Sequence, residues 1–121
     1  MSSFFKSDLV IDTLNTNGDV AINGDLTVTG DTTTVSTTNT VVSDKLLELA
    51  NGTTGTPSGD AGVVIERGSS NNVFIGWDES EDKVTVATGT FTGASTGDLS
   101  LTDAELKTGA ITASGDISTT G

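Results

Sequence analysis

The chain has 121 residues, 40 of them Val, Ile or Thr, and its 17 acidic residues against five basic ones give a formal net charge of −12. Side chains branched at Cβ favour strands, so this composition predicts an all-β protein, whereas the acidic field disfavours nucleic-acid partners and anionic membrane surfaces. His and Cys are absent, and without the usual metal ligands, general base or thiol nucleophile we expect no enzyme and no metal or other cofactor.

Residues 1–17 form a polar arm that carries two adjacent aromatic residues, Phe4 and Phe5. The apolar run of this arm is too short for a signal peptide, and nowhere does the chain approach the roughly 18 apolar residues that span a bilayer. Apolar side chains in a polar arm suit insertion into a groove of a partner protein. We therefore expect residues 1–17 to be a docking arm, and a disordered leader is the alternative.

A six-residue repeat begins at Gly18. The hexads GDVAIN, GDLTVT and GDTTTV fill residues 18–35. In the first two hexads, aliphatic residues lie two and four positions after Gly and so share one face of short strands; they are Val20, Ile22, Leu26 and Val28. Gly tolerates positive φ and Asp can hydrogen-bond its own backbone, so each Gly-Asp pair predicts a corner. The repeat predicts a shaft over residues 18–40.

Residues 41–88 lack the hexad period and predict a small antiparallel β-meander, which we call the knob. Residues 41–50 are ambiguous between a strand and a short helix, and we expect a strand because Val41 and Val42 open the segment. A Gly-rich loop at 51–62 follows. The expected strands then lie at 63–67, 73–77 and 83–87, with turns at 68–72 and 78–82. We expect Phe74 and Trp77 to form the core of the knob.

The hexad period returns over residues 89–121, which we expect to be a second hexad segment. Its aliphatic residues are Leu99, Leu101, Ile111 and Ile117. The hexad 103–108 breaks the phase, because its apolar residues have the wrong offsets, and so predicts a bulge or a strand reversal. The chain stops on a hexad boundary, as a repeat that continues in a longer fibre would.

The hexads of one chain are too few to form a stable solenoid, which needs about three or more stacked units. With only five aromatic residues in the chain, a monomer would also bury a thin core. Three identical chains around a common axis would bury one shared apolar centre and pair otherwise open strand edges. We therefore expect an intertwined homotrimeric β shaft. Its core would be Val20, Ile22, Leu26, Val28, Leu99, Leu101, Ile111 and Ile117.

Three linked segments are the most distinctive of the chain: SDKLLELANG at 43–52, DAGVVIERG at 60–68 and FIGWDESEDK at 74–83. Flanked by Gly-Asp hexads, they resemble a module of tail-fibre and other virion structural proteins of tailed bacteriophages, particularly marine cyanobacterial phages. The resemblance covers about 70 residues. It implies a homotrimeric, non-catalytic rod of the virion tail, assembled in the host cytoplasm and joining the tail to distal host-recognition parts.

The same resemblance implies that the docking arm contacts other phage tail proteins and that any contact with host surface glycan is indirect. Residues 66–68 and 76–80 match the module's distinctive positions, where they look like structural markers, so no binding role is assigned to them.

Three other functions have some support in the sequence. The acidic turn at 78–82 could bind Ca²⁺, but it lacks the alternating spacing of an EF-hand, and we expect a solvated turn. Trp77, with Arg67 in the same meander, could stack on a sugar, so a glycan-binding adhesin is the alternative function. Thr27 and Thr29 suit an ice-binding solenoid, but such pairs are too few for a flat array.

Overall fold

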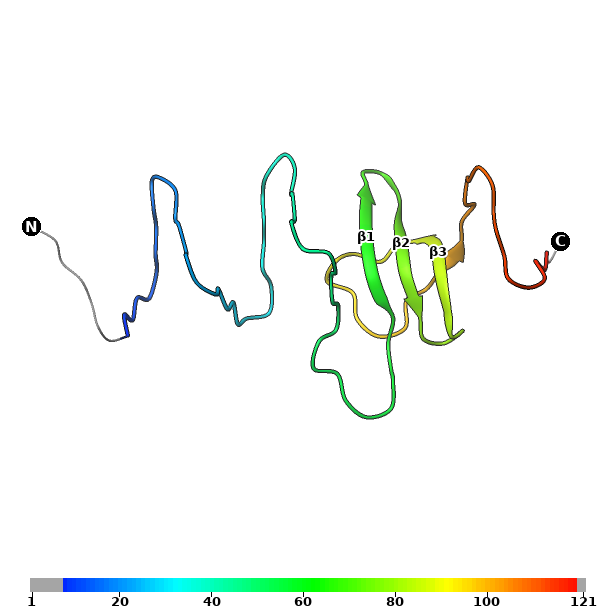
Figure 1. Cartoon of the computed structure of the whole chain (residues 1–121), viewed down its shortest axis with the longest axis horizontal. Coiled ribbons are helices and arrows are strands. Elements are labelled where there is room, and N and C mark those ends of the chain that lie inside the picture. Colours follow the sequence, from blue (N-terminus) through cyan, green and yellow to red (C-terminus); the bar gives the residue numbers. More distant parts are fainter. Residues whose placement is uncertain (1–7, 120–121) are drawn as a thin grey trace, which may run out of the picture. The chain divides into compact units, whose positions relative to one another are not determined.

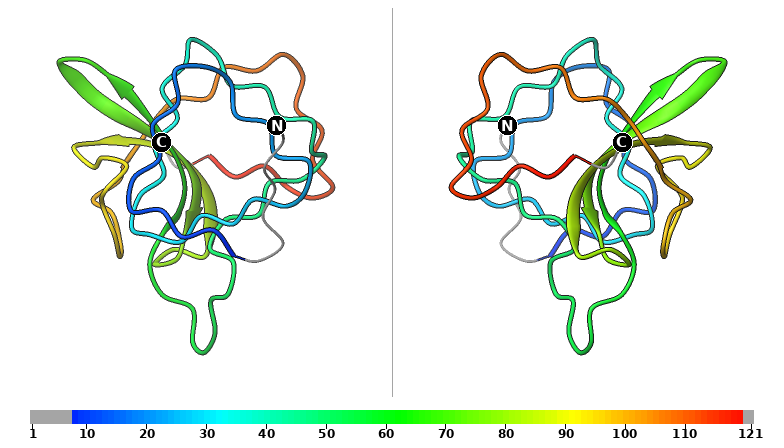
Figure 2. Two further views of the ribbon diagram at one scale, coloured as in Figure 1. Left: turned by 90° about the vertical axis from the view of Figure 1, so that its left-hand side faces the viewer. Right: turned by 90° about the vertical axis from the view of Figure 1, so that its right-hand side faces the viewer.

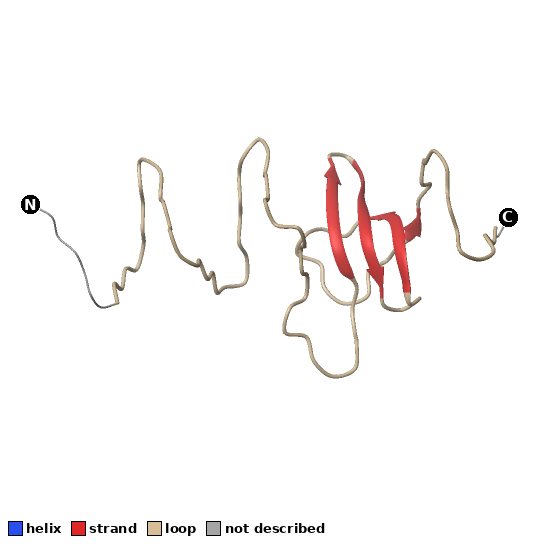
Figure 3. Ribbon diagram, viewed as in Figure 1, coloured by secondary structure: helices blue, strands red, loops and turns tan. Residues whose placement is uncertain are grey.

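The computed structural model describes residues 8–119, so Phe4 and Phe5 of the expected docking arm lie outside the described residues. The chain divides into two units, Met1–Val42 and Ser43–Gly121, and this division falls close to the boundary expected between shaft and knob. Residues 8–119 contain β-strands and no helix, as Figures 1 and 3 show. The prediction of an all-β protein is therefore confirmed.

Four strands form one antiparallel sheet. They are β1 (Ala61–Arg67), β2 (Ser70–Asp78), β3 (Lys83–Gly89) and β4 (Thr102–Asp103), and they lie in that order across the sheet. The first three confirm the predicted meander, but the turn between β1 and β2 is only Gly68 and Ser69. Gly68 has the positive φ, 66°, that a two-residue hairpin requires. The residues 70–72 that were expected in the turn therefore extend β2.

Residues 41–50 contain neither the expected strand nor the alternative helix. Val41 and Leu46 are 92% and 88% exposed, and none of the four strands pairs with this segment. The segment ends in a turn in which Thr53 N–H donates to the carbonyl of Ala50 at 3.3 Å. A strand needs a neighbouring strand for its backbone groups, and the prediction is wrong for the single chain because this neighbour is missing.

Residues 90–101 cross one face of the sheet before the chain returns to the edge of β3 as β4 (Figure 1). Phe91 of this crossing packs edge-to-face against Phe74 of β2, with ring centroids 6.0 Å apart and planes at 74°. Phe74, Phe91 and Ala87 of β3 are the buried apolar core, with 1%, 6% and 0% exposure. The knob therefore continues past its expected end at residue 88, because Phe91 completes its core.

Two facing glycines make room for the ring of Phe74. Gly62 of β1 pairs with Gly76 of β2, and a Cβ atom on either glycine would lie 2.7 Å from a carbon of that ring. The ring therefore lies against bare backbone.

The opposite face of the sheet is largely uncovered. We call it the open face; it consists of Val63, Ile65, Val73, Ile75, Trp77, Val84 and Val86. Trp77 is 41% exposed, so the expectation that it belongs to the knob core is wrong for the single chain. Neighbouring residues on a strand point to opposite faces, and two residues three apart, such as Phe74 and Trp77, therefore cannot share a core.

Candidate functional site

The predicted shaft, residues 18–40, is an extended coil without strands in the single chain. Its backbone bends at 17–18, 23–24, 30–31 and 37–38, close to the period of the hexads. Figure 2 shows this coil winding in wide turns. The corners thus lie near the Gly-Asp pairs, whereas strands are absent because the described residues offer this segment no pairing partner.

The aliphatic residues predicted to form the core of the shaft are uncovered. Val20, Ile22, Leu26 and Val28 are 57%, 51%, 68% and 58% exposed. Every described residue from 8 to 58 is in fact exposed. The two residues of each hexad are separated by one position in an extended backbone, and therefore lie on the same side of the chain. The segment presents paired aliphatic side chains but contains no core of its own.

The corner glycines do not have the backbone conformation expected of them. Gly18, Gly24 and Gly30 have no positive φ, and a Cβ atom on any of them would meet nothing within 4 Å. The expectation that these corners exploit positive φ is therefore wrong, although it holds at Gly97, with φ 77°. Within the single chain, nothing in the shaft requires glycine at these positions.

The aliphatic residues of the C-terminal segment fall into two groups. Ile111 and Ile117 are 65% and 63% exposed and resemble the shaft residues. Leu99 and Leu101 are half-buried against the knob. The expectation that these two leucines belong to the shaft core is not met, because residues 90–101 are held across the sheet.

Asp60 fixes this crossing in place, although its position in the sequence does not mark it as a structural residue. One oxygen of its carboxylate accepts from Glu79 N–H at 2.9 Å, and the other accepts from Leu99 N–H at 2.8 Å. Its own N–H donates to the carbonyl of Gly97 at 3.0 Å. One side chain thereby joins the start of β1, the turn after β2 and the crossing segment. No local pattern marks these contacts, because their partners lie 19 and 39 residues away.

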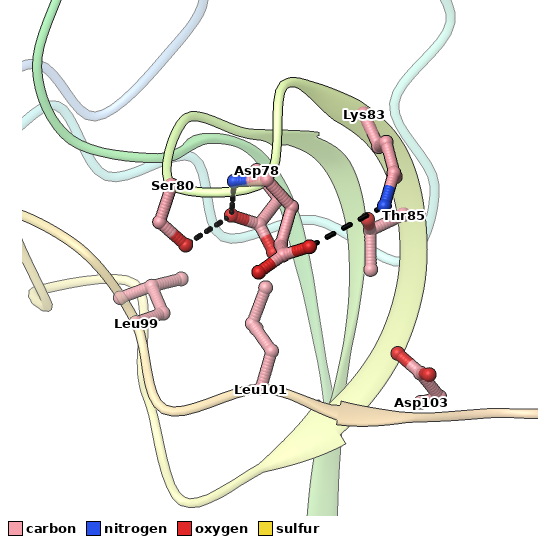
Figure 4. Close-up of a pocket in the computed structure, with 8 residues that line it drawn as sticks. Asp78, Ser80, Lys83, Thr85, Leu99, Leu101 and Asp103 are labelled. Atoms are coloured by element: carbon pink, nitrogen blue, oxygen red, sulfur yellow. Dashed lines mark hydrogen bonds and ion pairs between the residues drawn. The ribbon is translucent and has the colours of Figure 1, made fainter.

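A polar groove lies between the β2–β3 turn and the end of the crossing (Figure 4). It has a volume of about 390 Å³ and is lined by Asp78, Ser80, Glu81, Lys83, Thr85, Leu99, Leu101 and Asp103. Asp78 is 7% exposed, and its Oδ1 accepts from Ser80 Oγ at 2.8 Å and from Glu81 N–H at 3.1 Å. Small-molecule sites are mostly apolar, whereas four residues of this lining, Asp78, Ser80, Glu81 and Lys83, bond to one another within the turn. The groove is therefore best explained as a braced turn.

The acidic side chains of this turn point to separate partners. Glu79 Oε2 accepts from Trp77 Nε1 at 2.8 Å, and Glu81 Oε2 pairs with Lys83 Nζ at 3.3 Å. Among residues 8–119, no three acidic side chains are arranged to hold a metal ion.

Trp77 and Arg67 do not form a shared sugar site. Trp77 pairs with Ala61 at the N-terminal end of β1, whereas Arg67 lies at the C-terminal end of β1 and pairs with Ser70. The guanidinium of Arg67 donates to the carbonyl of Asn71 at 3.2 Å. Trp77 and Arg67, which the adhesin alternative would combine in one sugar site, therefore lie at opposite ends of the β1–β2 pair.

Comparison with known proteins gives no match: no protein-family model fits the chain, and no curated protein or solved structure is significantly similar to it. In the part of the chain that the structure describes, no helix has the length and apolar character needed to cross a membrane.

Proposed function

We propose that the chain is a non-catalytic structural component of a bacteriophage tail or tail fibre and assembles as a homotrimeric rod. In this rod, residues 18–40 of three chains wind together, and each chain also contributes a knob. Residues 1–17 dock the rod onto another tail protein. The phage assignment is supported by the distinctive segments of residues 43–83, and the trimer is supported by the surfaces of the chain.

One observation carries the proposal: the hexad aliphatics are ordered in pairs yet uncovered. Val20, Ile22, Leu26 and Val28 are all more than half exposed. Burying an aliphatic side chain of this kind stabilises a protein by about 1.5–3 kcal/mol. A periodic row of such side chains, with unpaired backbone on either side, is suited to contact with other chains of the same period.

The corner glycines give independent support. Gly18, Gly24 and Gly30 recur at the period of the repeat, although nothing within the single chain requires them. Glycine at such a position allows another backbone to approach closely. Intertwined chains would bring backbones together at these corners once in each hexad.

The oligomeric state tests the trimer. Native mass spectrometry of the full chain should give three copies, and Val28→Asp should give monomers because a charge would be buried at the shared axis. Thr27→Asp is the matched control, since it adds the same charge on the other side of the extended chain, and it should remain trimeric. A monomeric wild-type chain at micromolar concentration would contradict the trimer, and a trimeric Val28→Asp variant would contradict the register.

The phage assignment has a separate test. Antibodies against the knob should label the tails of purified phage particles in electron micrographs. Labelling of no particle would contradict the virion location. The alternative adhesin has one observation in its favour, the exposed indole of Trp77. It predicts that the assembled chain binds immobilised glycans and that Trp77→Ala abolishes this binding.

A further inference from the structure

The open face of the knob is a continuous apolar surface without charge. Its register runs from the row Ala61, Trp77 and Val84 to the row Ile65, Val73 and Thr88. No charged residue occupies any open-face position between these rows. In a chain of net charge −12, this is a surface on which two copies can approach without bringing acidic side chains together.

The polar atom of the aromatic side chain on this face already has a partner. Trp77 Nε1 donates to Glu79 Oε2 at 2.8 Å, so the indole can be covered without leaving an unpaired donor. The carboxylate of Glu79 lies at the end of the sheet and forms a polar rim. Apolar centre, aromatic anchor and polar rim together have the composition of a protein interface.

The extent of the face indicates what covers it. Its five most exposed side chains are Val63, Ile65, Ile75 and Trp77 at 41–48% and Val84 at 77%. They present on the order of 400 Å² of apolar surface. A stable protein complex buries about 800 Å² on each partner, so this face alone is about half of an interface. The exposed hexad aliphatics of the same chain supply the rest of the contact area in the proposed assembly. A second copy of this chain would cover both surfaces, and it is therefore the partner that fits the area.

We propose that the open face is the contact between knobs of neighbouring copies, so that each knob completes its second apolar layer only in the oligomer. This inference rests on the proposed homotrimer. It assigns Trp77 and Ile75 to the interface between copies and leaves Phe74 in the core of each knob. The face is then a second oligomer contact, separate in sequence from the hexads.

Trp77 is the only tryptophan of the chain, so its fluorescence reports on this face alone. Acrylamide is a suitable quencher because it is neutral, whereas the acidic chain would repel iodide. The quenching constant should be several-fold lower in the wild-type assembly than in monomers obtained by dilution or by Val28→Asp. A trimer in which acrylamide reaches Trp77 as freely as in the monomer would overturn the open-face contact and leave the trimer standing. A dimer with protected Trp77 would overturn the trimer and leave the open-face contact standing. A wild-type monomer with accessible Trp77 would overturn both the trimer and the open-face contact.

A pair of variants tests the same contact by assembly. Ile75→Asp places a charge at the centre of the open face and should raise the dissociation constant of the oligomer at least tenfold. Ser70→Asp adds the same charge on the same strand, but at an exposed position outside the open face, and should leave the constant unchanged. Equal constants for both variants would overturn the contact. Circular dichroism of the knob strands shows whether each variant is folded, and if Ile75→Asp is not, quenching of the wild-type chain decides.

Discussion

Asp60 shows how a knob with so few apolar residues keeps a defined shape. Each oxygen of its carboxylate accepts one backbone N–H, from Glu79 and from Leu99, so both donors are satisfied without a strand ladder. Hydrogen bonds to a charged acceptor are stronger than neutral ones. The side chain therefore does for the crossing segment what a longer β4 would otherwise do.

Replacing Asp60 should loosen the crossing. Asp60→Asn retains one acceptor oxygen and loses the other, so one backbone N–H is left unpaired, and we expect the free energy of unfolding to fall by about 1–3 kcal/mol. Asp98→Asn is the control, because Asp98 is exposed and its substitution changes the net charge equally. Urea unfolding followed by circular dichroism measures both. Equal stability of the two variants would show that the carboxylate does not hold the crossing.

The glycine pair beneath Phe74 leads to a second prediction at this scale. In Gly76→Ala the new methyl group would collide with the Phe74 ring and with the backbone of β1, including the carbonyl of Ala61. We expect a loss of about 1–3 kcal/mol in the free energy of unfolding, as for an overpacked core. Gly93→Ala should be close to neutral, since a Cβ there meets nothing within 4 Å. Thermal unfolding compares them, and a neutral Gly76→Ala would mean that both the ring and the backbone of β1 can move aside.

At the level of elements, the sequence predicts the strands and turns that are determined by residues close together in the chain. The strands β1, β2 and β3 follow from alternation and turn residues, so their approximate positions are predictable. The crossing at 90–101 and β4 are not predicted, because they depend on Phe91 meeting Phe74 across 17 residues. The broken phase at 103–108 is the only local irregularity of the hexads close to β4, and the structure has no bend or turn within residues 104–108. Phe74 and Trp77 lie three positions apart on one strand, so strand alternation places them on opposite faces and excludes a shared core.

Substitution of a corner glycine of the hexads should affect assembly and not the stability of the knob, unlike substitution of Gly76. Gly24→Ala should leave the stability of the knob unchanged, because a Cβ at position 24 has open space in the single chain. In the proposed trimer we expect the same methyl group to hold backbones apart and to raise the dissociation constant by about tenfold, or 1.4 kcal/mol. Analytical ultracentrifugation across a dilution series measures this constant. Asn23→Ala, the adjacent exposed corner residue, is the control, and equal constants for both variants would remove the glycine argument for close-wound chains.

For the whole molecule, charge opposes the assembly that the apolar surfaces favour. Each chain carries a formal charge of −12, and in the proposed trimer three such chains would repel one another over distances comparable to the Debye length. Among residues 8–119 the only ion pair is Glu81 with Lys83, and both side chains are largely exposed. The acidic residues therefore act mainly as a solvating and repulsive layer.

This opposition predicts how assembly responds to salt. Raising NaCl from about 10 mM to about 1 M shortens the Debye length from about 30 Å to about 3 Å, so the proposed trimer should become tighter as repulsion between chains is screened. Ultracentrifugation at several NaCl concentrations measures the change. A variant with Asp19→Asn and Asp25→Asn should depend less on salt, because both residues are exposed on the hexads. If interchain ion pairs held the chains together instead, salt would weaken the wild-type trimer, and the apolar account of the shaft and the open face would be contradicted.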